Sequence, residues 1–260
     1  MPVPAQNQQY ENFIIRYKQN THGGFDYESD ETFQIVNDLF GILPELELSS
    51  YSYSSIPRCY TYMDTGALST SGVTGLHNHP YLKLQGKGTL VAVIDSGIDY
   101  LHPAFHNGVQ SKIFSIWDQT LEGGADGRIP FGREFGRQQI EQALASENPW
   151  EIVPSSDTNG HGTRSAATAA GYRIEKDNFC GAAPEAEIVI VKLKQAKNYL
   201  RDFYLLPRDI DIFQEDDIML AISYVLFIAQ EQQMPLSICI GLGTSMGAHQ
   251  GEGPLNEYIN

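Results

Sequence analysis

The sequence is poor in basic residues, in cysteine and in long apolar runs. Its 17 lysines and arginines stand against 32 acidic residues, a net charge of −15, which disfavours binding to nucleic-acid phosphates or anionic lipid. Cys59, Cys180 and Cys239 form no CxxC pair, which indicates reduced thiols rather than a disulfide framework or a zinc site. No apolar run approaches the roughly 20 residues that span a membrane. We therefore expect neither nucleic acid nor a membrane as a partner.

The first residues also lack the features of a secretory signal. Residues 1–9 contain neither a basic stretch nor an apolar one, so no signal peptide is visible and we expect an intracellular protein. Hydrophobic residues make up 42% of the 260 residues, which excludes broad disorder. The length allows one large domain, or one domain with a small additional unit.

The N-terminal part divides into three segments. Residues 1–8 are polar, and we expect them to be disordered. Residues 9–56 predict a small β-α-β unit that should dock on the rest of the chain, because about fifty residues rarely form a stable core alone. Its helix is placed at residues 31–40 by apolar residues at helical spacing, between strands at 11–17 and 46–55. Residues 57–85 lack apolar periodicity and predict a linker or extended arm.

Residues 86–260 alternate between strand and helix patterns. Apolar runs predict strands, and small or apolar residues after position 161 and over 216–232 predict helices; the strands are placed at 90–94, 112–117, within 182–193 and at 236–240. This alternation favours an α/β domain with a parallel sheet flanked by helices. Residues 118–153 read as an insertion with one short helix, and 194–214 as an irregular excursion.

Two motifs carry chemistry. The buried strand predicted at 90–94 ends abruptly at Asp95, as a parallel strand ends at a functional loop. His161 lies between two glycines and precedes a run of small residues, which suits a reactive imidazole at the start of a helix packed closely on a sheet. Taken alone, Asp95 also fits a turn cap and the Gly-His-Gly segment a simple turn.

Together, Val-Ala-Val-Ile-Asp-Ser-Gly at 91–97 with His-Pro at 102–103, and Asn-Gly-His-Gly-Thr at 159–163, resemble the aspartate and histidine signatures of the subtilisin-like serine proteases, peptidase family S8. Within that family the chain is similar to the clostridial Csp-type proteases of spore germination. The similarity covers roughly residues 86–260, and residues 9–56 resemble the family's prodomain only weakly.

The resemblance implies peptide-bond hydrolysis through a Ser-His-Asp triad. His161 would be the general base and Asp95 would orient its ring. Gly241, Leu242 and Gly243 would correspond to the substrate-binding strand and turn, although many relatives carry serine at the first of these positions. The implied substrate is a peptide or protein, and family analogy allows a sibling pro-protein. The resemblance also implies an intracellular or spore-associated protein that requires no cofactor, and it allows a structural Ca²⁺.

The nucleophile is the missing part of this interpretation. Gly-Thr-Ser-Met-Gly at 243–247 looks like the family's serine motif, but Ser245 directly follows the strand that matches the substrate-binding strand. The family's serine instead follows further strands and the oxyanion asparagine. We therefore do not assign Ser245 as the nucleophile. We expect the chain to end partway through the domain and to be inactive alone. The alternative is a non-catalytic pseudoprotease or regulatory binding module in spore germination.

Two further groups of residues receive structural interpretations. We expect the acidic cluster to be a solvated loop and helix start rather than a calcium site, because its spacing matches no calcium loop; it consists of Asp209, Asp211, Glu215, Asp216 and Asp217. His77 and His79 lack neighbouring cysteine or carboxylate ligands, so we expect an exposed loop there rather than a metal site.

Overall fold

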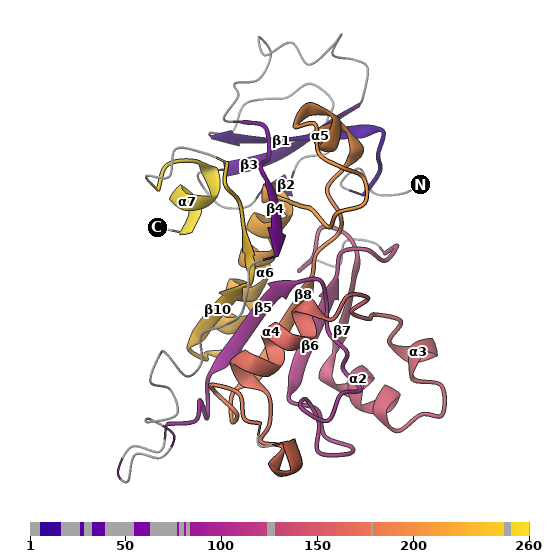
Figure 1. The fold of residues 1–260 in the computed structure, drawn as a ribbon, viewed down its shortest axis with the longest axis vertical. Helices are drawn as coiled ribbons and strands as arrows, with labels where there is room; N and C mark the ends of the chain where they lie inside the picture. Colours follow the sequence, from indigo (N-terminus) through magenta and orange to yellow (C-terminus); the bar gives the residue numbers. More distant parts are fainter. Residues whose placement is uncertain are drawn as a thin grey trace.

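The computed structural model describes residues 6–16, 27–28, 33–39, 55–62, 77, 81, 84–123, 128–177, 179–246 and 251–259. A five-stranded sheet at its centre has the order β10-β5-β8-β6-β7 (Figure 1). Its strands are β5 (Leu90–Asp95), β6 (Ile113–Asp118), β7 (Arg133–Gly136), β8 (Glu187–Lys192) and β10 (Leu236–Ile240). Only β7 runs antiparallel to its neighbour. The predicted α/β class with a parallel sheet is confirmed.

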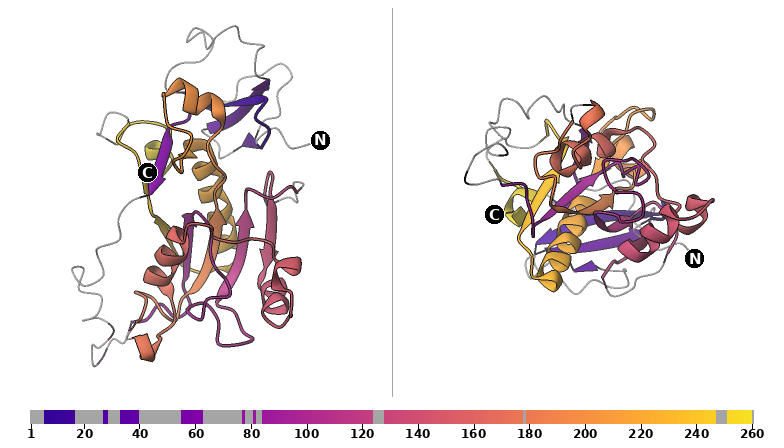
Figure 2. Two further views of the ribbon diagram at one scale, coloured as in Figure 1. Left: turned by 45° about the vertical axis from the view of Figure 1, so that its right-hand side comes forward. Right: turned by 90° about the horizontal axis from the view of Figure 1, so that it is seen from below.

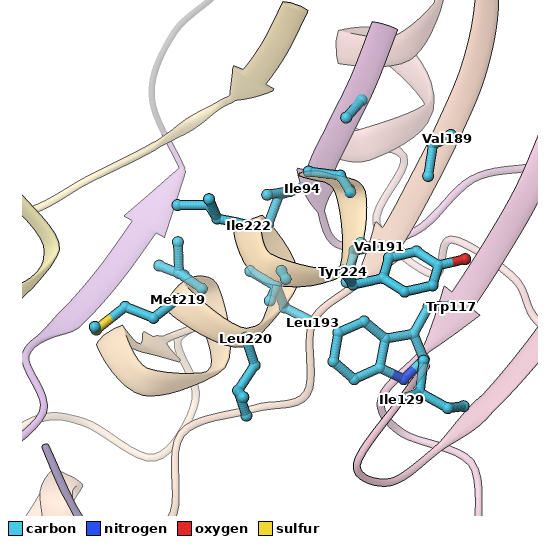
Figure 3. Packing of buried hydrophobic residues seen from close by; sticks show 14 of the residues in the cluster. Ile94, Trp117, Ile129, Val189, Val191, Leu193, Met219, Leu220, Ile222 and Tyr224 are labelled. Carbon is cyan, nitrogen blue, oxygen red and sulfur yellow. The ribbon is translucent and has the colours of Figure 1, made fainter. Parts of the chain in front are cut away.

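Helices cover both faces of this sheet. The long helix α6 (Glu215–Gln232) packs on one face, and α4 (His161–Ala170) with α2 (Arg137–Leu144) packs on the other. Along β5, Leu90, Ala92 and Ile94 face the α6 side, whereas Val91 and Val93 face the α4 side. Figure 3 shows Ile222 of α6 lying beside Ile94. Both faces of β5 are therefore buried, which explains its continuous apolar run.

The remaining elements lie around this core. The insertion after β6 contributes β7, α2 and a second short helix, α3 (Pro149–Ile152). The segment predicted to be irregular at 194–214 contains α5 (Asn198–Phe203) and the two-residue strand β9 (Phe213–Gln214). The chain continues after β10 through β11 (Leu242–Gly243) to α7 (Pro254–Ile259).

The N-terminal unit differs from the prediction. Its described strands are β1 (Tyr10–Arg16), β2 (Tyr27–Glu28) and β3 (Phe33–Leu39), in the order β1-β3-β2. The helix predicted at 31–40 is wrong, because β3 pairs antiparallel with β1 over all seven residues. Cross-strand pairing of Ile35 and Val36, which are β-branched, outweighs a helical spacing that rests on few positions. Nearly all of the strand predicted at 46–55 lies outside the described residues.

The structure also differs from two other predictions for the N-terminal part. Gln6 donates from Nε2 to the carbonyl oxygens of Gln119 (2.9 Å) and Leu121 (2.8 Å), and Gln8 accepts from the N–H of Asn198 (2.8 Å), so residues 6–8 are ordered where we expected disorder. The segment expected to be a linker contains strand β4 (Cys59–Tyr62), which pairs with both β9 and β11. Figure 2 shows β4 lying between the N-terminal strands and the central sheet.

A buried polar junction joins the N-terminal unit to α6. Asn12 of β1 donates to Asp216 (2.9 Å) and to Asn37 of β3 (3.1 Å), and it accepts from the Lys197 ammonium. The hydroxyl of Tyr199 accepts from the Asn12 N–H (2.9 Å) and donates to the Asn12 carbonyl (2.7 Å). Both backbone groups of Asn12 and both ends of its amide are thus satisfied in the interior.

The acidic residues that begin α6 are part of this junction, so the expectation of a solvated helix start is wrong for them. Glu215, Asp216 and Asp217 are all 0% exposed. Glu215 accepts from the Arg58 N–H (3.1 Å), and Asp217 forms an ion pair with Lys194 (2.5 Å). The charges are tolerated in the interior because other segments of the chain supply partners for them.

Lys112 contacts the C-terminal end of α4, and its burial makes the free energy of unfolding depend on pH. It is 4% exposed, and its ammonium donates to the carbonyl oxygens of Ala170 and Pro184. Burial lowers the pKa of Lys112 from 10.5 to about 8, and the nearby Cys180 opposes this change. Between these two pH values the unfolded chain binds more protons, so raising the pH removes a cost of about 3 kcal/mol to the folded state.

We therefore expect the free energy of unfolding of the wild type, minus that of Lys112→Met, to increase between pH 8 and 10.5. Urea unfolding of both chains at several pH values in this window measures the difference. A difference that stays constant, or falls, contradicts the assigned titration.

Candidate active site

Asp95 is the last residue of β5 and is 1% exposed. Its Oδ1 accepts the N–H of Ser96 at 2.7 Å. The strand lies between β10 and β8 in the sheet, where Asp95 pairs with Lys192. The carboxylate is thus held at the carboxyl edge of the sheet by its own backbone, as the abrupt end of the apolar run predicted.

His161 is the first residue of α4 and is 8% exposed. Gly160 precedes it with φ +78°, a left-handed conformation that glycine adopts without strain. The N–H of His161 donates to Oδ1 of Asn159 at 2.8 Å. The turn therefore aims the imidazole from the helix start toward the sheet edge.

The two predicted residues meet directly. Nδ1 of His161 lies 2.8 Å from Oδ1 and 3.0 Å from Oδ2 of Asp95. A carboxylate can only accept, so Nδ1 carries the proton, and in a neutral ring Nε2 is then the basic nitrogen. This arrangement can take a proton from a hydroxyl placed at Nε2 and can stabilise the imidazolium that results.

The glycines around His161 have different roles. A Cβ on Gly162 would lie 2.2 Å from the carbonyl oxygen of Gly97 and 3.2 Å from Cβ of Asp95, so α4 approaches the end of β5 too closely for a side chain. A Cβ on Gly160 would meet nothing within 4 Å. The close packing of the helix on the sheet therefore requires Gly162, while Gly160 serves the left-handed turn.

Gly241 lies against the pair. β10 runs parallel to β5 with Ile240 opposite Ile94, which brings the next residue beside Asp95. A Cβ on Gly241 would be 2.8 Å from Oδ2 of Asp95 and 3.1 Å from Cε1 of His161. Burial raises the pKa of the Cys239 thiol two residues earlier, and the Asp95 charge adds to this effect. A side chain at position 241 would therefore require the side chains of Asp95 and His161 to shift.

The other two residues predicted to bind substrate form β11. Leu242 pairs with Tyr62 and Gly243 with Thr61, antiparallel, so the chain's own strand β4 lies along this edge. On its other side β4 pairs antiparallel with β9, where Cys59 is opposite Gln214. An extended segment therefore already lies between β11 and β9.

Ser245 is exposed and follows β11 in a turn closed by the Met246 N–H, which donates to the Thr244 hydroxyl at 3.1 Å. His77 is half-buried, with Nε2 2.6 Å from the carbonyl oxygen of Ala182, and His79 lies outside the described residues. In the part of the chain that the structure describes, no three His, Cys, Asp or Glu side chains are grouped so that they could hold a metal ion.

Sequence reasoning missed two residues next to the pair. Asp157 accepts from the Ser96 hydroxyl (2.8 Å), and Ser96 in turn accepts from the Gly162 N–H (2.9 Å). Asp157 also accepts from the N–H (2.8 Å) and the hydroxyl (2.7 Å) of Thr163. An aspartate four residues before His161 was the available signal, because acidic side chains are favoured at helix starts.

Comparison with known proteins places this geometry in context. Residues 86–204 match the model of the subtilase family. Two Arabidopsis thaliana relatives are subtilisin-like protease SBT1.4, 30% identical over 125 residues, and SBT1.9, 28% identical over 142 residues. These alignments cover 42% and 49% of this chain but only 16% and 18% of the relatives.

Among solved structures, the CspB protease of Clostridium perfringens is similar with a TM-score of 0.58 and 30% identity. The match covers 72% of this chain and 36% of that protein. The chain therefore spans well under half the length of the relatives it matches. No helix among the described residues is long and apolar enough to cross a membrane.

Proposed function

We propose, from the premise that residues 86–204 of this chain are part of a subtilisin-like, subtilase-family domain, that the chain supplies the aspartate and histidine of a serine endopeptidase. The observation that carries the proposal is the 2.8 Å contact between Nδ1 of His161 and Oδ1 of the buried Asp95. His161 would act as general base toward a serine and then as general acid toward the leaving amine. Asp95 would hold the histidine in the tautomer with the proton on Nδ1 and would stabilise the imidazolium.

The substrate is a peptide or protein that binds as an extended strand along residues 241–243. Pairing of β4 with β11 supports this proposal, because the backbone of residues 242–243 already binds an extended segment of the chain itself. Main-chain hydrogen bonds of this kind give affinity that depends little on sequence. A substrate that pairs with the same edge of β11 would have to displace β4.

The nucleophile of this proposal is not Ser245. That residue is exposed and follows directly on β11, whereas the base is buried beside β10. The 260-residue chain alone should therefore not hydrolyse peptides. Occupation of the substrate edge by β4 also favours a second candidate function, a regulatory binding module that keeps the Asp–His pair without turnover.

Labelling with a fluorophosphonate tests the proposal, because the reagent bonds only to activated serines. We expect no label at Ser245 in this chain. We expect a fusion of this chain to the remaining catalytic part of the Clostridium perfringens CspB protease to be labelled at the serine of the added part. His161→Ala should lower that labelling by about 10⁴-fold or more.

Label on Ser245 that disappears in His161→Ala would refute our exclusion of this residue. Label in the fusion that survives His161→Ala would refute the role of the histidine. A folded fusion that takes no label would favour the regulatory module. Glu147→Gln, a change at an exposed residue in the turn before α3, is the matched control and should leave labelling unchanged.

A further inference from the structure

The carboxylate of Asp157 ties the end of β5 to the start of α4. Its Oδ1 accepts the hydroxyl of Ser96 at 2.8 Å and the N–H of Gly160 at 3.1 Å. Its Oδ2 accepts the N–H of Thr163 at 2.8 Å and the hydroxyl of the same residue at 2.7 Å. Four donors from two separate elements thus converge on one side chain.

These contacts complete the start of α4. The first N–H groups of a helix have no partner within it, and the glycine at the N-cap has no side chain to offer. Here the N–H groups of residues 160–163 are all bonded to side chains, those of Asp157, Asn159 and Ser96. The position of His161 at the beginning of α4 therefore depends on residues outside the helix.

The same contacts reach the partner of His161. The hydroxyl of Ser96 donates a hydrogen bond to Asp157 and accepts one from the Gly162 N–H at 2.9 Å, and the N–H of Ser96 donates to Asp95 at 2.7 Å. One residue thus touches the carboxylate of the pair, the helix that carries the imidazole, and Asp157. A shift at Asp157 must move both ends of the pair relative to each other.

We propose that Asp157 is a positioning residue that sets the distance and the tautomer of the Asp95–His161 pair. The proposal rests on the proposed function insofar as this pair is catalytic. Asp157 acts through the backbone of α4 and through Ser96, and it touches no reacting atom.

The ionisation of Asp157 agrees with this role. Burial alone would raise its pKa, but the hydrogen bonds from Thr163, Ser96 and Gly160 outweigh burial and lower it. The side chain is therefore a carboxylate at neutral pH. A negative charge at the start of a helix is favourable, and an amide at this place would present two donors to groups that are themselves donors.

The test is nitrogen and proton NMR of the imidazoles in the 260-residue chain, which needs no catalytic activity. In the wild type we expect a strongly downfield Nδ1 proton on His161 and an unprotonated Nε2. In Asp157→Asn we expect this resonance to be lost and the two tautomers to mix. Ser96→Ala removes the hydroxyl that links Asp157 to the Gly162 N–H, but Asp157 keeps its contacts with Thr163. This variant should therefore weaken the Nδ1 resonance without abolishing it.

Ala169→Gly, two turns further along α4, is the matched control. It weakens the helix but should leave the Nδ1 resonance unchanged, whereas a purely structural role of Asp157 would make both variants behave alike. A resonance unchanged in folded Asp157→Asn overturns the inference and leaves the proposed function intact. If Asp157→Asn does not fold, an unchanged resonance in Ser96→Ala overturns it. Absence of the resonance in the wild type overturns the proposed function itself.

Discussion

Gly162→Ala is expected to lower the free energy of unfolding by about 3 kcal/mol or more. The added Cβ would lie 2.2 Å from the carbonyl oxygen of Gly97 and 3.0 Å from its nitrogen. These are backbone atoms at the end of β5 and cannot rotate away as a flexible side chain could. The contact can be relieved only if α4 moves away from the sheet, and this movement would also separate His161 from Asp95.

Urea unfolding of Gly162→Ala and Gly160→Ala measures the effect. Gly160 is the matched control, because its added Cβ has free space and costs only the strain of φ +78°, about 1 kcal/mol. In the folded fraction of Gly162→Ala, the Nδ1 proton resonance of His161 should also be lost. Equal unfolding midpoints for the two variants would show that the approach of α4 to β5 is not the constraint.

Lys194→Met is expected to destabilise the chain by about 3 to 5 kcal/mol at neutral or higher pH. The ammonium of Lys194 lies 2.5 Å from Oδ2 of Asp217, which is 0% exposed, and Oδ1 of Asp217 has no hydrogen-bond partner among the residues that the structure describes. Removing Lys194 leaves a buried carboxylate without a hydrogen-bond donor among the described residues, and only the charge of Lys197 still favours its ionised form. Breaking such a pair costs more than the pair contributes, because the remaining charge stays buried.

The effect should depend on pH. Burial raises the pKa of Asp217 from 3.8 to about 7, and Lys194 opposes this change. Without Lys194 the pKa of Asp217 rises further, so the Asp217 carboxyl binds its proton more tightly in the folded state than in the unfolded state. Stability is then lost as the pH rises from about 4 through the folded-state pKa. The loss relative to the wild type should be larger at pH 8 than at pH 5.

Urea unfolding at these two pH values checks the prediction. Asp217→Asn in the Lys194→Met background removes the unpaired charge and should recover part of the loss at pH 8. Arg208→Met, which breaks the exposed pair with Asp202, is the control and should change stability by less than about 1 kcal/mol. A loss for Lys194→Met that is the same at both pH values would contradict the assignment.

The sequence predicted the centre of the molecule well because its signals there are local. A continuous apolar run needs burial on both faces, so β5 and β8 could be placed from their own residues. The end of β5 placed Asp95 at the sheet edge, and the small residues after His161 indicated the close packing of α4. These predictions depended on no partner strand.

The failures occurred where distant segments decide the structure. Helical spacing at 31–40 gave way to pairing with β1, which supplies a partner for every residue of β3. The segment expected to be a linker became β4 because β9 and β11, far along the chain, provide two free edges. The acidic start of α6 is buried because Arg58, Lys194 and Asn12 reach it from three other segments.

For the candidate site, the sequence by itself determined which residues are the candidates, since Asp95 and His161 are marked by their immediate neighbours. Only the tertiary structure decided how they are held. The 2.8 Å contact, the close packing of Gly162 and Gly241, and the bonds of Asp157 join residues from three separate segments. Such distances depend on how strands and helices pack in three dimensions, and no local pattern in the chain encodes them.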